Sequence, residues 1–199
     1  MRPLKPRAFV MPVVALAVCL LMACGAGHMY ISDEADLAFY QRVGVIPFAN
    51  FASDRNAAEK VTSTFTNELL MMQSLAVINQ GDLNGVISTS VTRDITNAME
   101  DFTAEEFAAI GEAAGVEGVF VGAVKDFSMV RSGQEEFPLV ALVVRFVDCP
   151  TGRVVWSYEV SRKGGPKFPI FSFGETHTLG EMTSKTCHEI AQSFGRLVR

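Results

Sequence analysis

The apolar residues in the first half of the chain follow two spacings, one typical of strands and one typical of helices. Short apolar runs at Val43–Phe48 and Leu75–Ile78, each followed by turn residues, predict two buried strands. Between them, Asn56 and Glu59 have the spacing of a capping box, and apolar residues then recur every three or four positions, which predicts a helix at 57–73. Because a strand, a helix and a strand in this order form a right-handed crossover, the two strands should be parallel neighbours.

Helical spacing returns twice in the second half of the chain. A capping box beginning at Thr103 precedes a helix predicted at 104–114. A third capping box begins at Thr178, ahead of an apolar stripe that predicts a helix from Leu179 to near the end of the chain. The stretch before the first of these helices is less regular, and it predicts one short helix at Leu83–Ser88.

Three longer strands are predicted between these two helices. Val119–Val130 and Leu139–Asp148 are apolar on both faces over much of their length, which is typical of central strands. A polar connection is expected between them at Arg131–Phe137, and the tight turn at 149–152 leads into the third strand, Arg153–Ser161. This third strand alternates cleanly, so one of its faces is expected to meet water or a partner.

These elements predict one α/β domain with a mixed sheet, in the order β-α-β-α-α-β-β-β-α, at residues 42–199. The aromatic loop at Arg162–Glu175 is expected to pack against the domain, and the alternative is that it is kept free for a partner.

The beginning of the chain has the layout of a secretory signal. Basic residues precede the apolar run Ala8–Leu21, which is shorter than the roughly 18 to 20 residues of a membrane span. The basic residues are Arg2, Lys5 and Arg7. The run ends in Leu21, Met22, Ala23 and Cys24, which resemble the lipobox of bacterial lipoproteins. In that family the signal is cut before the cysteine, which is then acylated.

The lipobox resemblance divides the chain into three parts. Residues 1–23 are expected to be the signal peptide, 24–41 a lipidated tether and 42–199 a periplasmic domain. It implies a covalent diacylglycerol and an N-acyl lipid on Cys24, and no cofactor besides these lipids. Gly25, in the position after the cysteine, resembles signals that sort to the outer membrane, so the predicted location is that membrane, with the domain facing the periplasm.

Charge argues against nucleic acid as a partner. Three of the 17 basic side chains lie in the predicted signal peptide, so the remaining chain has 14 basic and 22 acidic side chains, a net charge of −8. Nucleic acids and anionic lipid surfaces both attract clusters of Lys and Arg. Attachment to the membrane is therefore expected to depend on the acyl chains, of which two or more hold a protein stably.

Cys149 and Cys187 are two of the four cysteines in the chain, and they are expected to remain after cleavage and acylation. In an oxidising periplasm they could form a disulfide, provided that their Cα atoms come within about 7 Å. Two buried free thiols are the equal alternative.

Catalytic chemistry is sparse in the predicted domain. His177 and His188 are its only histidines, and His188 follows Cys187 directly, so the two side chains would point about 100° apart on a helix and make a poor catalytic pair. No pair of Cys or His residues has the spacing of a metal site. The sequence therefore predicts no enzyme, no catalytic or metal-ligating residues and no small-molecule substrate.

Several local segments together resemble the CsgG-like periplasmic lipoproteins. They are Val43–Phe48 ahead of a helix, the strand Val119–Asp126 after a helix ended by Gly115, and a hairpin from Phe146 through Thr151-Gly152 to Trp156. The family includes the curli secretion lipoprotein and, more distantly, the lipoprotein activator of penicillin-binding proteins and the N-terminal domain of the Tol β-propeller protein. The resemblance implies a fold like the anticodon-binding domain, without a role in RNA binding.

The resemblance implies a non-enzymatic lipoprotein that binds other envelope proteins and supports the assembly or secretion of a surface structure. One alternative is a regulator of a peptidoglycan synthase. The other is an oligomeric secretion pore, which the curli protein builds from two long amphipathic hairpins. The corresponding segment here is short and charged, with Arg131, Glu135 and Glu136, so no pore-lining residues are assigned. Self-association into a homo-oligomer is left open.

Overall fold

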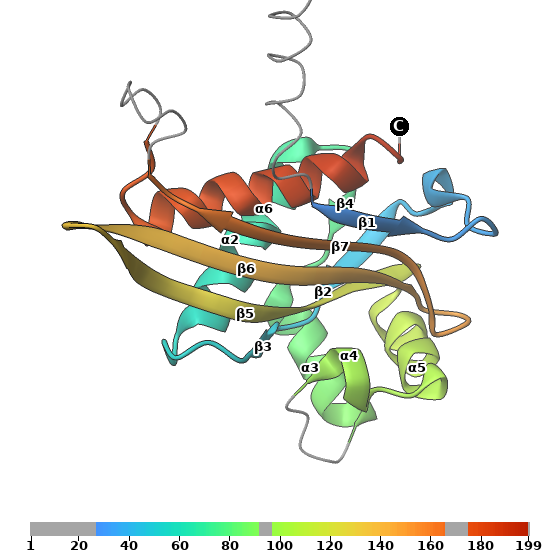
Figure 1. Ribbon diagram of the computed structural model, residues 1–199. Helices are drawn as coiled ribbons and strands as arrows, with labels where there is room; N and C mark the ends of the chain where they lie inside the picture. The colour runs from blue at the N-terminus through green and yellow to red at the C-terminus, as the bar shows by residue number, and fades with distance from the viewer. Residues whose placement is uncertain (1–26, 92–96, 166–174, 199) are drawn as a thin grey trace, which may run out of the picture.

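One mixed sheet of seven strands runs through the computed structural model, which describes residues 27–91, 97–165 and 175–198 (Figure 1). The strands are β1 (His28–Ile31), β2 (Arg42–Val45), β3 (Ala49–Asn50), β4 (Ala76–Val77), β5 (Gly118–Ser132), β6 (Glu135–Asp148) and β7 (Arg153–Lys163). Their order across the sheet is β1-β7-β6-β5-β2-β4, and β3 pairs with β5 beyond the end of β2. β1 and β4 are therefore the edge strands of this path.

The sheet combines a parallel part with an antiparallel part. β2 pairs in parallel with β4 and β5, whereas β5, β6 and β7 form two antiparallel hairpins, and β1 adds antiparallel to β7. The parallel pairing of β2 with β4 confirms the crossover that was predicted from the first strand, helix and strand.

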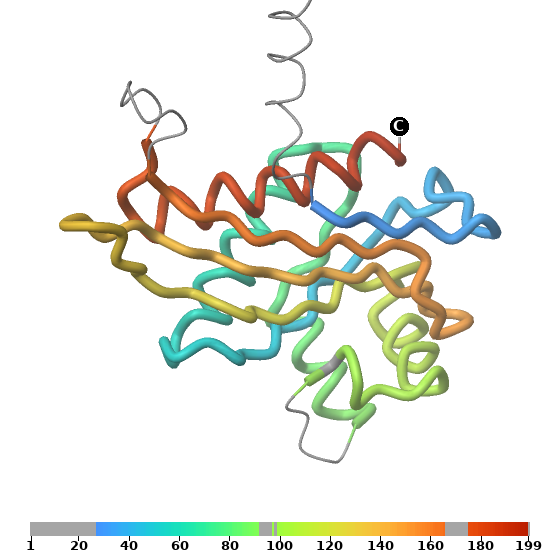
Figure 2. The backbone as a smooth tube through the Cα atoms, in the orientation of Figure 1, coloured from blue at the N-terminus to red at the C-terminus, as the bar shows by residue number. Residues whose placement is uncertain are grey.

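Five α-helices in the described residues cover the sheet from two sides (Figures 1 and 2). They are α2 (Ala57–Met72), α3 (Gln80–Ser90), α4 (Ala98–Asp101), α5 (Ala104–Ala114) and α6 (Leu179–Gly195), and a short 3-10 turn, η1, lies at Leu37–Phe39. Side chains of α2 and α6 pack in one cluster with one face of β5, whereas side chains of α3 and α5 pack with its other face. α2 and α6 thus cover one face of the sheet, whereas the helices on the other face cover it around β2 and β5 and leave part of β7 open.

Aromatic rings fill the layer beneath α2 and α6. Phe120 of β5, Phe146 of β6 and Trp156 of β7 lie on this face of the sheet, and all three are fully buried. Phe194 of α6 contacts each of these rings, with centroid distances of 4.9, 4.8 and 5.2 Å, respectively. Such tilted and edge-to-face pairs add to the free energy gained by burial, so this cluster fixes α6 to the three long strands.

Close packing on the other face depends on glycine. A Cβ atom at Gly44 of β2 would lie 2.9 Å from the Leu83 side chain of α3, and one at Gly111 of α5 would lie 2.4 Å from the Cβ of Cys149. The flexible end of Leu83 would have to shift in the first case, whereas in the second the Cβ of Cys149, next to its backbone, leaves no room for a side chain. These two glycines therefore let α3 and α5 approach the sheet closely.

The predicted fold class and the main element order are confirmed. The predicted α/β domain with its mixed sheet is present, and β1, β3 and α4 are added to the predicted order. The helix predicted at 104–114 matches α5, and its capping box forms, because Thr103 and Glu106 exchange hydrogen bonds with each other's backbone N–H groups. The short predicted helix at Leu83–Ser88 is longer in the structure, where α3 covers Gln80–Ser90.

Two local predictions are wrong. Asn56 makes no capping hydrogen bond with its side chain, and the carboxylate of Asp54 instead accepts one from its N–H at 2.8 Å. The expected polar connection at Arg131–Phe137 is a continuation of β5 and β6, whose paired residues reach Ser132 and Glu135. Polar residues are compatible with a strand there because the end of the hairpin meets solvent on both faces.

The predicted tether at 24–41 is also too long. Within it, His28–Ile31 form β1, and Leu37 and Tyr40 are only 5% and 6% exposed in the core beneath α2 and α6. The folded domain therefore includes residues from β1 onwards, and does not begin near Arg42. Of the aromatic loop expected at Arg162–Glu175, residues 166–174 lie outside the described residues.

Candidate interaction surface

β1 leaves one edge of the sheet without a further strand in the described residues. It pairs with β7 on one side, in a register that joins Met29 to Tyr158 and Ile31 to Trp156. The backbone N–H and C=O groups on its other side are therefore open to another chain. Proteins usually protect such an edge, because it can pair with a strand of a partner.

The side chains of β1 are unusually apolar for an exposed edge. Met29, Tyr30 and Ile31 are 50%, 54% and 37% exposed. Paired residues in a sheet point to the same side, so Met29 and Ile31 lie on the side of α6, like their partners Tyr158 and Trp156. Tyr30 points to the other side. The edge thus offers apolar contacts on both faces, and we call Met29, Tyr30 and Ile31 the β1 edge.

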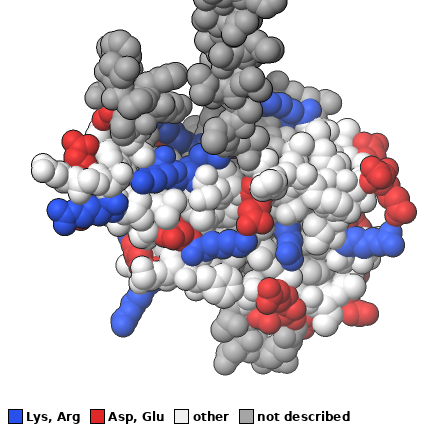
Figure 3. Space-filling view, viewed as in Figure 1, with Lys and Arg blue, Asp and Glu red and all other residues white. Residues whose placement is uncertain are grey.

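Next to Tyr30, part of the sheet carries polar side chains. Ser157 of β7 and Arg145 of β6 follow Tyr30 in the same row across the sheet. Lys125 of β5 and Glu159 of β7 lie close by and form an ion pair at 2.6 Å. Basic and acidic side chains are interspersed over the side of the molecule seen in Figure 3. This surface is consistent with the prediction that one face of the third long strand meets water or a partner.

A recess of about 740 Å³ adjoins the β1 edge. Tyr30, the loop at 32–36 and Phe39 form one wall, and residues of the β6–β7 turn and the beginning of β7 form the other. Phe39 is 64% exposed, so it adds a second aromatic side chain to the apolar surface that Tyr30 presents. The recess and the β1 edge together form a continuous surface of exposed aromatic and backbone groups.

The recess is predominantly acidic. Asp33, Glu34, Asp36 and Asp148 line it, and Arg153 is its only basic lining residue. Arg153 forms an ion pair with Glu34 at 2.9 Å. Asp148 accepts hydrogen bonds from the hydroxyl groups of Tyr40 and Thr151, and burial followed by the bond to Asp148 raises the pKa of Tyr40 above its usual value. The hydrogen bonds of Asp148 hold η1 against the β6–β7 turn, which shapes the recess.

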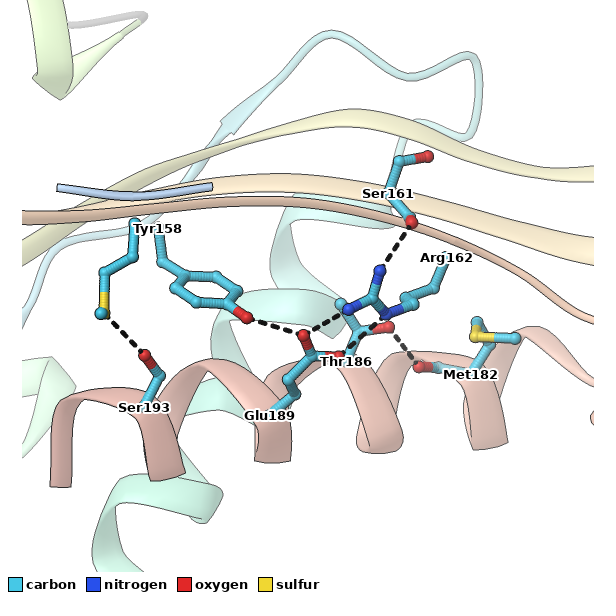
Figure 4. Close-up of polar contacts among 8 residues, drawn as sticks. Tyr158, Ser161, Arg162, Met182, Thr186, Glu189 and Ser193 are labelled. Carbon is cyan, nitrogen blue, oxygen red and sulfur yellow. Dashed lines mark hydrogen bonds and ion pairs between the residues drawn. The ribbon is translucent and has the colours of Figure 1, made fainter. Parts of the chain in front are cut away.

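A polar network connects β7 to α6 beside the β1 edge (Figure 4). Glu189 of α6 accepts hydrogen bonds from the guanidinium group of Arg162 at 2.9 and 2.5 Å, and one from the hydroxyl group of Tyr158 at 2.7 Å. Burial, followed by this hydrogen bond, raises the pKa of Tyr158. The two hydrogen bonds between Arg162 and Glu189 orient these two side chains and fix β7 to α6.

β1 is attached to the same part of the molecule. The hydroxyl group of Ser193 on α6 donates a hydrogen bond to Met29 Sδ at 3.3 Å. A Cβ atom at Gly27 would lie 2.5 Å from the Tyr158 ring, so only glycine allows the backbone to pass so close to this ring. The chain therefore enters the domain against β7 and the C-terminal half of α6.

The structure does not form the disulfide between Cys149 and Cys187. Both thiols are free and buried, and they lie in separate hydrophobic clusters on opposite faces of the sheet. Burial raises the pKa of each thiol to about 12. Of the two alternatives left open by the sequence, the structure has the buried free thiols.

His177 and His188 each contact a carboxylate, and His177 Nε2 lies 3.0 Å from a carboxylate oxygen of Glu175. His188 Nδ1 lies 2.8 Å from a carboxylate oxygen of Glu68, whereas Cys187 Sγ lies 3.9 Å from the carbonyl oxygen of Val61. The two side chains thus point to different neighbours, as expected for adjacent residues on a helix. No group of three or more His, Cys, Asp or Glu residues that could hold a metal ion occurs in the described segments.

The predicted lipidation motif, Leu21, Met22, Ala23 and Cys24, lies outside the described residues. Sequence reasoning missed the β1 edge because His28–Ile31 was assigned to the tether. The local signal was the apolar run Met29-Tyr30-Ile31, which stands out in an otherwise small and polar segment.

Among the helices of residues 27–91, 97–165 and 175–198, none is both long and apolar enough to cross a membrane.

Comparisons with known proteins show a shared fold. The PelC dodecamer from Paraburkholderia phytofirmans is 15% identical, with a TM-score of 0.56 over 86% of this chain and 97% of that chain. The lipoprotein GNA1162 from Neisseria meningitidis is 18% identical, with a TM-score of 0.51 over 76% of this chain and 99% of that chain. The hypothetical protein CT253 from Chlamydia trachomatis is 14% identical, with a TM-score of 0.50 over 79% of this chain and 98% of that chain. No protein-family model and no curated protein sequence matches the chain. At identities this low, the likeness establishes the fold.

Proposed function

We propose that the chain is a lipoprotein of the bacterial envelope, anchored by acyl chains on Cys24, whose domain binds other envelope proteins through the β1 edge. The observation that carries this proposal is the position of the edge. Met29, Tyr30 and Ile31 are exposed on a strand that begins four residues after the cysteine of the lipobox. A domain held in this way presents the open edge of β1 and its apolar side chains beside the anchor.

The fold comparisons are consistent with this assignment. One protein of the same fold is described as a lipoprotein and another as a dodecamer. The outer membrane, with the domain in the periplasm, is the proposed location, because Gly25 follows Cys24. The interspersed charges of the sheet surface and the acidic recess suit a protein partner better than nucleic acid, which attracts clustered Lys and Arg.

Replacement of the anchoring cysteine tests the first part of the proposal. We expect the Cys24→Ala variant, exported behind a signal peptide whose cleavage does not need the cysteine, to remain folded but to move from the membrane fraction to the soluble periplasmic fraction. Metabolic labelling with a fatty acid should mark the unchanged protein and leave the variant unlabelled. A variant that still sediments with membranes, or an unchanged protein that takes up no label, would overturn the assignment as a lipoprotein.

A photo-reactive side chain at position 30 tests the second part in living cells. Tyr30 is 54% exposed on the β1 edge, and Phe51 is 61% exposed in the loop after β3, so the two aromatic residues form a matched pair. We expect covalent adducts with other proteins from position 30 and far fewer from position 51. Equal yields at both positions would show that the β1 edge is not the binding surface.

Self-association is a second candidate, because both edges of the sheet expose apolar side chains. At the edge opposite β1, Leu70 and Met71 at the end of α2 are 51% and 65% exposed, and Leu70 borders a recess of about 350 Å³ lined also by Val77 of β4. Two different surfaces that bind each other produce a head-to-tail assembly, which closes into a ring when the rotation allows it.

The molar mass of the full-length protein in detergent tests this candidate. If the β1 edge forms one side of the contact, Tyr30→Glu should reduce the mass to that of a monomer, because the carboxylate would be buried without a partner. Phe51→Glu is the control and should keep the assembly. A monomeric unchanged protein would exclude the homo-oligomer, and with it the oligomeric pore, whose further test is ion conductance in lipid bilayers.

The regulator of a peptidoglycan synthase remains the alternative among non-enzymatic functions. Its test is the rate of glycan-strand synthesis by purified synthases with and without the protein. A rate that does not change would exclude this function.

A further inference from the structure

The position of Gly27 restricts how far the domain can move from a lipid attached to Cys24. Gly27 lies against the Tyr158 ring, and β1 begins at the next residue, His28. Four residue steps connect Cys24 to His28, and an extended chain of this length spans at most about 14 Å. This length is close to the diameter of a single helix with its side chains, about 10 to 12 Å. The lipid and the entry point of the domain must therefore be near neighbours.

We propose that the outer face of α6 and the α6 side of β1, where Met29 lies, rest on the same membrane that holds the acyl chains of Cys24, so that Tyr30 and the open backbone edge remain available to a protein partner. This inference depends on the proposed lipidation. The occupant of the surface is the lipid headgroup layer, and the reason is the short chain between the anchor and β1. Met29 connects the two elements, since it belongs to β1 and accepts a hydrogen bond from Ser193 of α6.

The charges on α6 are compatible with a headgroup layer. Its exposed residues include one row along the helix, consisting of Ser184, Lys185, His188, Gln192 and Arg196, the residue that caps its end. The two carboxylates of the helix each have a cationic partner: Glu181 pairs with Lys185 at 2.7 Å, and Glu189 pairs with Arg162. Exposed α6 therefore carries no uncompensated carboxylate, although the chain after the signal peptide is acidic.

Arg196 can also extend along a lipid surface, whereas Lys185 Nζ is held by Glu181 and Thr176. Long basic side chains place their apolar stems against lipid or protein and keep the charge among polar headgroups. Met29 is half exposed next to Ser193 and can add an apolar contact. This face is thus neutral to basic, with a small apolar margin at β1.

α5 lies on the opposite face of the sheet and differs in charge. Ile110 on its buried side belongs to the same hydrophobic cluster as Val119 of β5, and the residues of α6 belong to the cluster on the other face. Glu105 and Glu112 are exposed on its outer side. Figure 1 places α6 and α5 on opposite sides of the sheet. When α6 rests on the membrane, α5 therefore faces away from it, and its acidic surface lies in the aqueous space.

Fluorescence quenching in vesicles tests this orientation. Gln192→Cys on α6 and Ala113→Cys on α5 place one label each on exposed helical positions of the full-length, lipidated protein. Cys149 and Cys187 are buried, so the introduced thiol reacts selectively, and the unchanged protein measures any background. The vesicles consist of phosphatidylcholine with a fraction of lipids that carry a nitroxide on the headgroup.

We expect several-fold stronger quenching of the label at position 192 than of the label at position 113. Ser184→Cys gives a second position on α6 and should behave like position 192. If the protein floats with the vesicles but quenching is equal at the two helices, or stronger at position 113, the orientation is wrong and the lipidation stands. A protein that does not float with the vesicles overturns the lipidation and the orientation together.

Discussion

Arg162 of β7 and Glu189 of α6 form a bidentate ion pair with N–O distances of 2.9 and 2.5 Å. The two side chains are 26% and 33% exposed, and Glu189 also accepts the hydrogen bond from Tyr158. The pair therefore lies between the solvent and the core, where a charged hydrogen bond contributes more than on an open surface. It connects the last strand to the helix that covers it.

Arg162→Ala should reduce the free energy of unfolding by about 1 to 2 kcal/mol, because Glu189 loses its cationic partner while it remains largely buried. Lys125→Ala is the matched control. It removes an ion pair with Glu159 whose side chains are 48% and 51% exposed, and it should change stability by less than about 1 kcal/mol. Urea unfolding measures both variants. Equal losses in the two variants would mean that the pair on α6 is no stronger than an ordinary surface ion pair.

Gly111→Ala in α5 should destabilise the domain by about 1 to 3 kcal/mol, because the new Cβ would lie 2.4 Å from the Cβ of Cys149. Gly85→Ala in α3 is the matched control, since no atom lies within 4 Å of its Cβ position. There alanine should stabilise the helix by about 0.5 to 1 kcal/mol. The opposite signs of the two effects can be read from thermal unfolding. A stable Gly111→Ala protein would show that α5 is able to move away from the sheet.

The sequence predicted the elements whose signals are local, and it missed those that depend on distant pairing. The helices at 57–73 and 104–114 were found because their apolar periodicity lies within the elements themselves, and the capping box at Thr103 is equally local. β1 has four residues and depends on β7, about 130 positions further along the chain, so its formation is decided by tertiary contacts. The length of the β5–β6 hairpin was underestimated for a related reason, because its charged end has no apolar pattern and is held by pairing between the strands.

The candidate interaction surface could be predicted only in part. The clean alternation of Arg153–Ser161 correctly indicated a strand with one open face, which lies beside the β1 edge. The recess arises from residues in the loop at 32–36 and the turn at 149–152, and no local pattern in the sequence brings these two segments together. The sequence could not predict whether Cys149 and Cys187 form a disulfide, because their positions in the chain are compatible with a disulfide and with two free thiols. In the structure the sheet lies between the two thiols and keeps them apart.

Thr103→Ala should destabilise the protein by about 1 kcal/mol, since it removes an N-cap whose hydroxyl group accepts a hydrogen bond from Glu106 N. Asn56→Ala is the matched control at the start of α2. Both positions match the same sequence motif, but the side chain of Asn56 makes no capping bond, so its replacement should have little effect. Urea unfolding again measures the difference. A loss at Asn56 as large as that at Thr103 would mean that Asn56 caps α2 in solution.

The buried thiols should make the stability of the protein fall in alkaline solution. Burial raises the pKa of Cys149 and Cys187 from 9.0 to about 12 in the folded state, whereas an unfolded chain exposes ordinary thiols. Above pH 9 the unfolded state therefore loses protons that the folded state keeps, and ionisation favours unfolding. The stabilisation is complete below pH 9 and is lost as the pH rises from 9 towards 12, at a rate of at most about 1.4 kcal/mol per pH unit for each thiol.

Unfolding in urea at pH 8, 9 and 10 tests this prediction against a variant in which Cys149 and Cys187 are both alanine. The variant should be less stable than the unchanged protein at pH 8, because two buried side chains become smaller and leave space in the core. Its stability should fall less between pH 9 and pH 10, because the thiol ionisation is gone and only other groups, such as Tyr40 and Tyr158 with their raised pKa values, still contribute. Parallel curves for the two proteins would show that the thiols ionise equally in the folded and unfolded states, which contradicts their burial on opposite faces of the sheet.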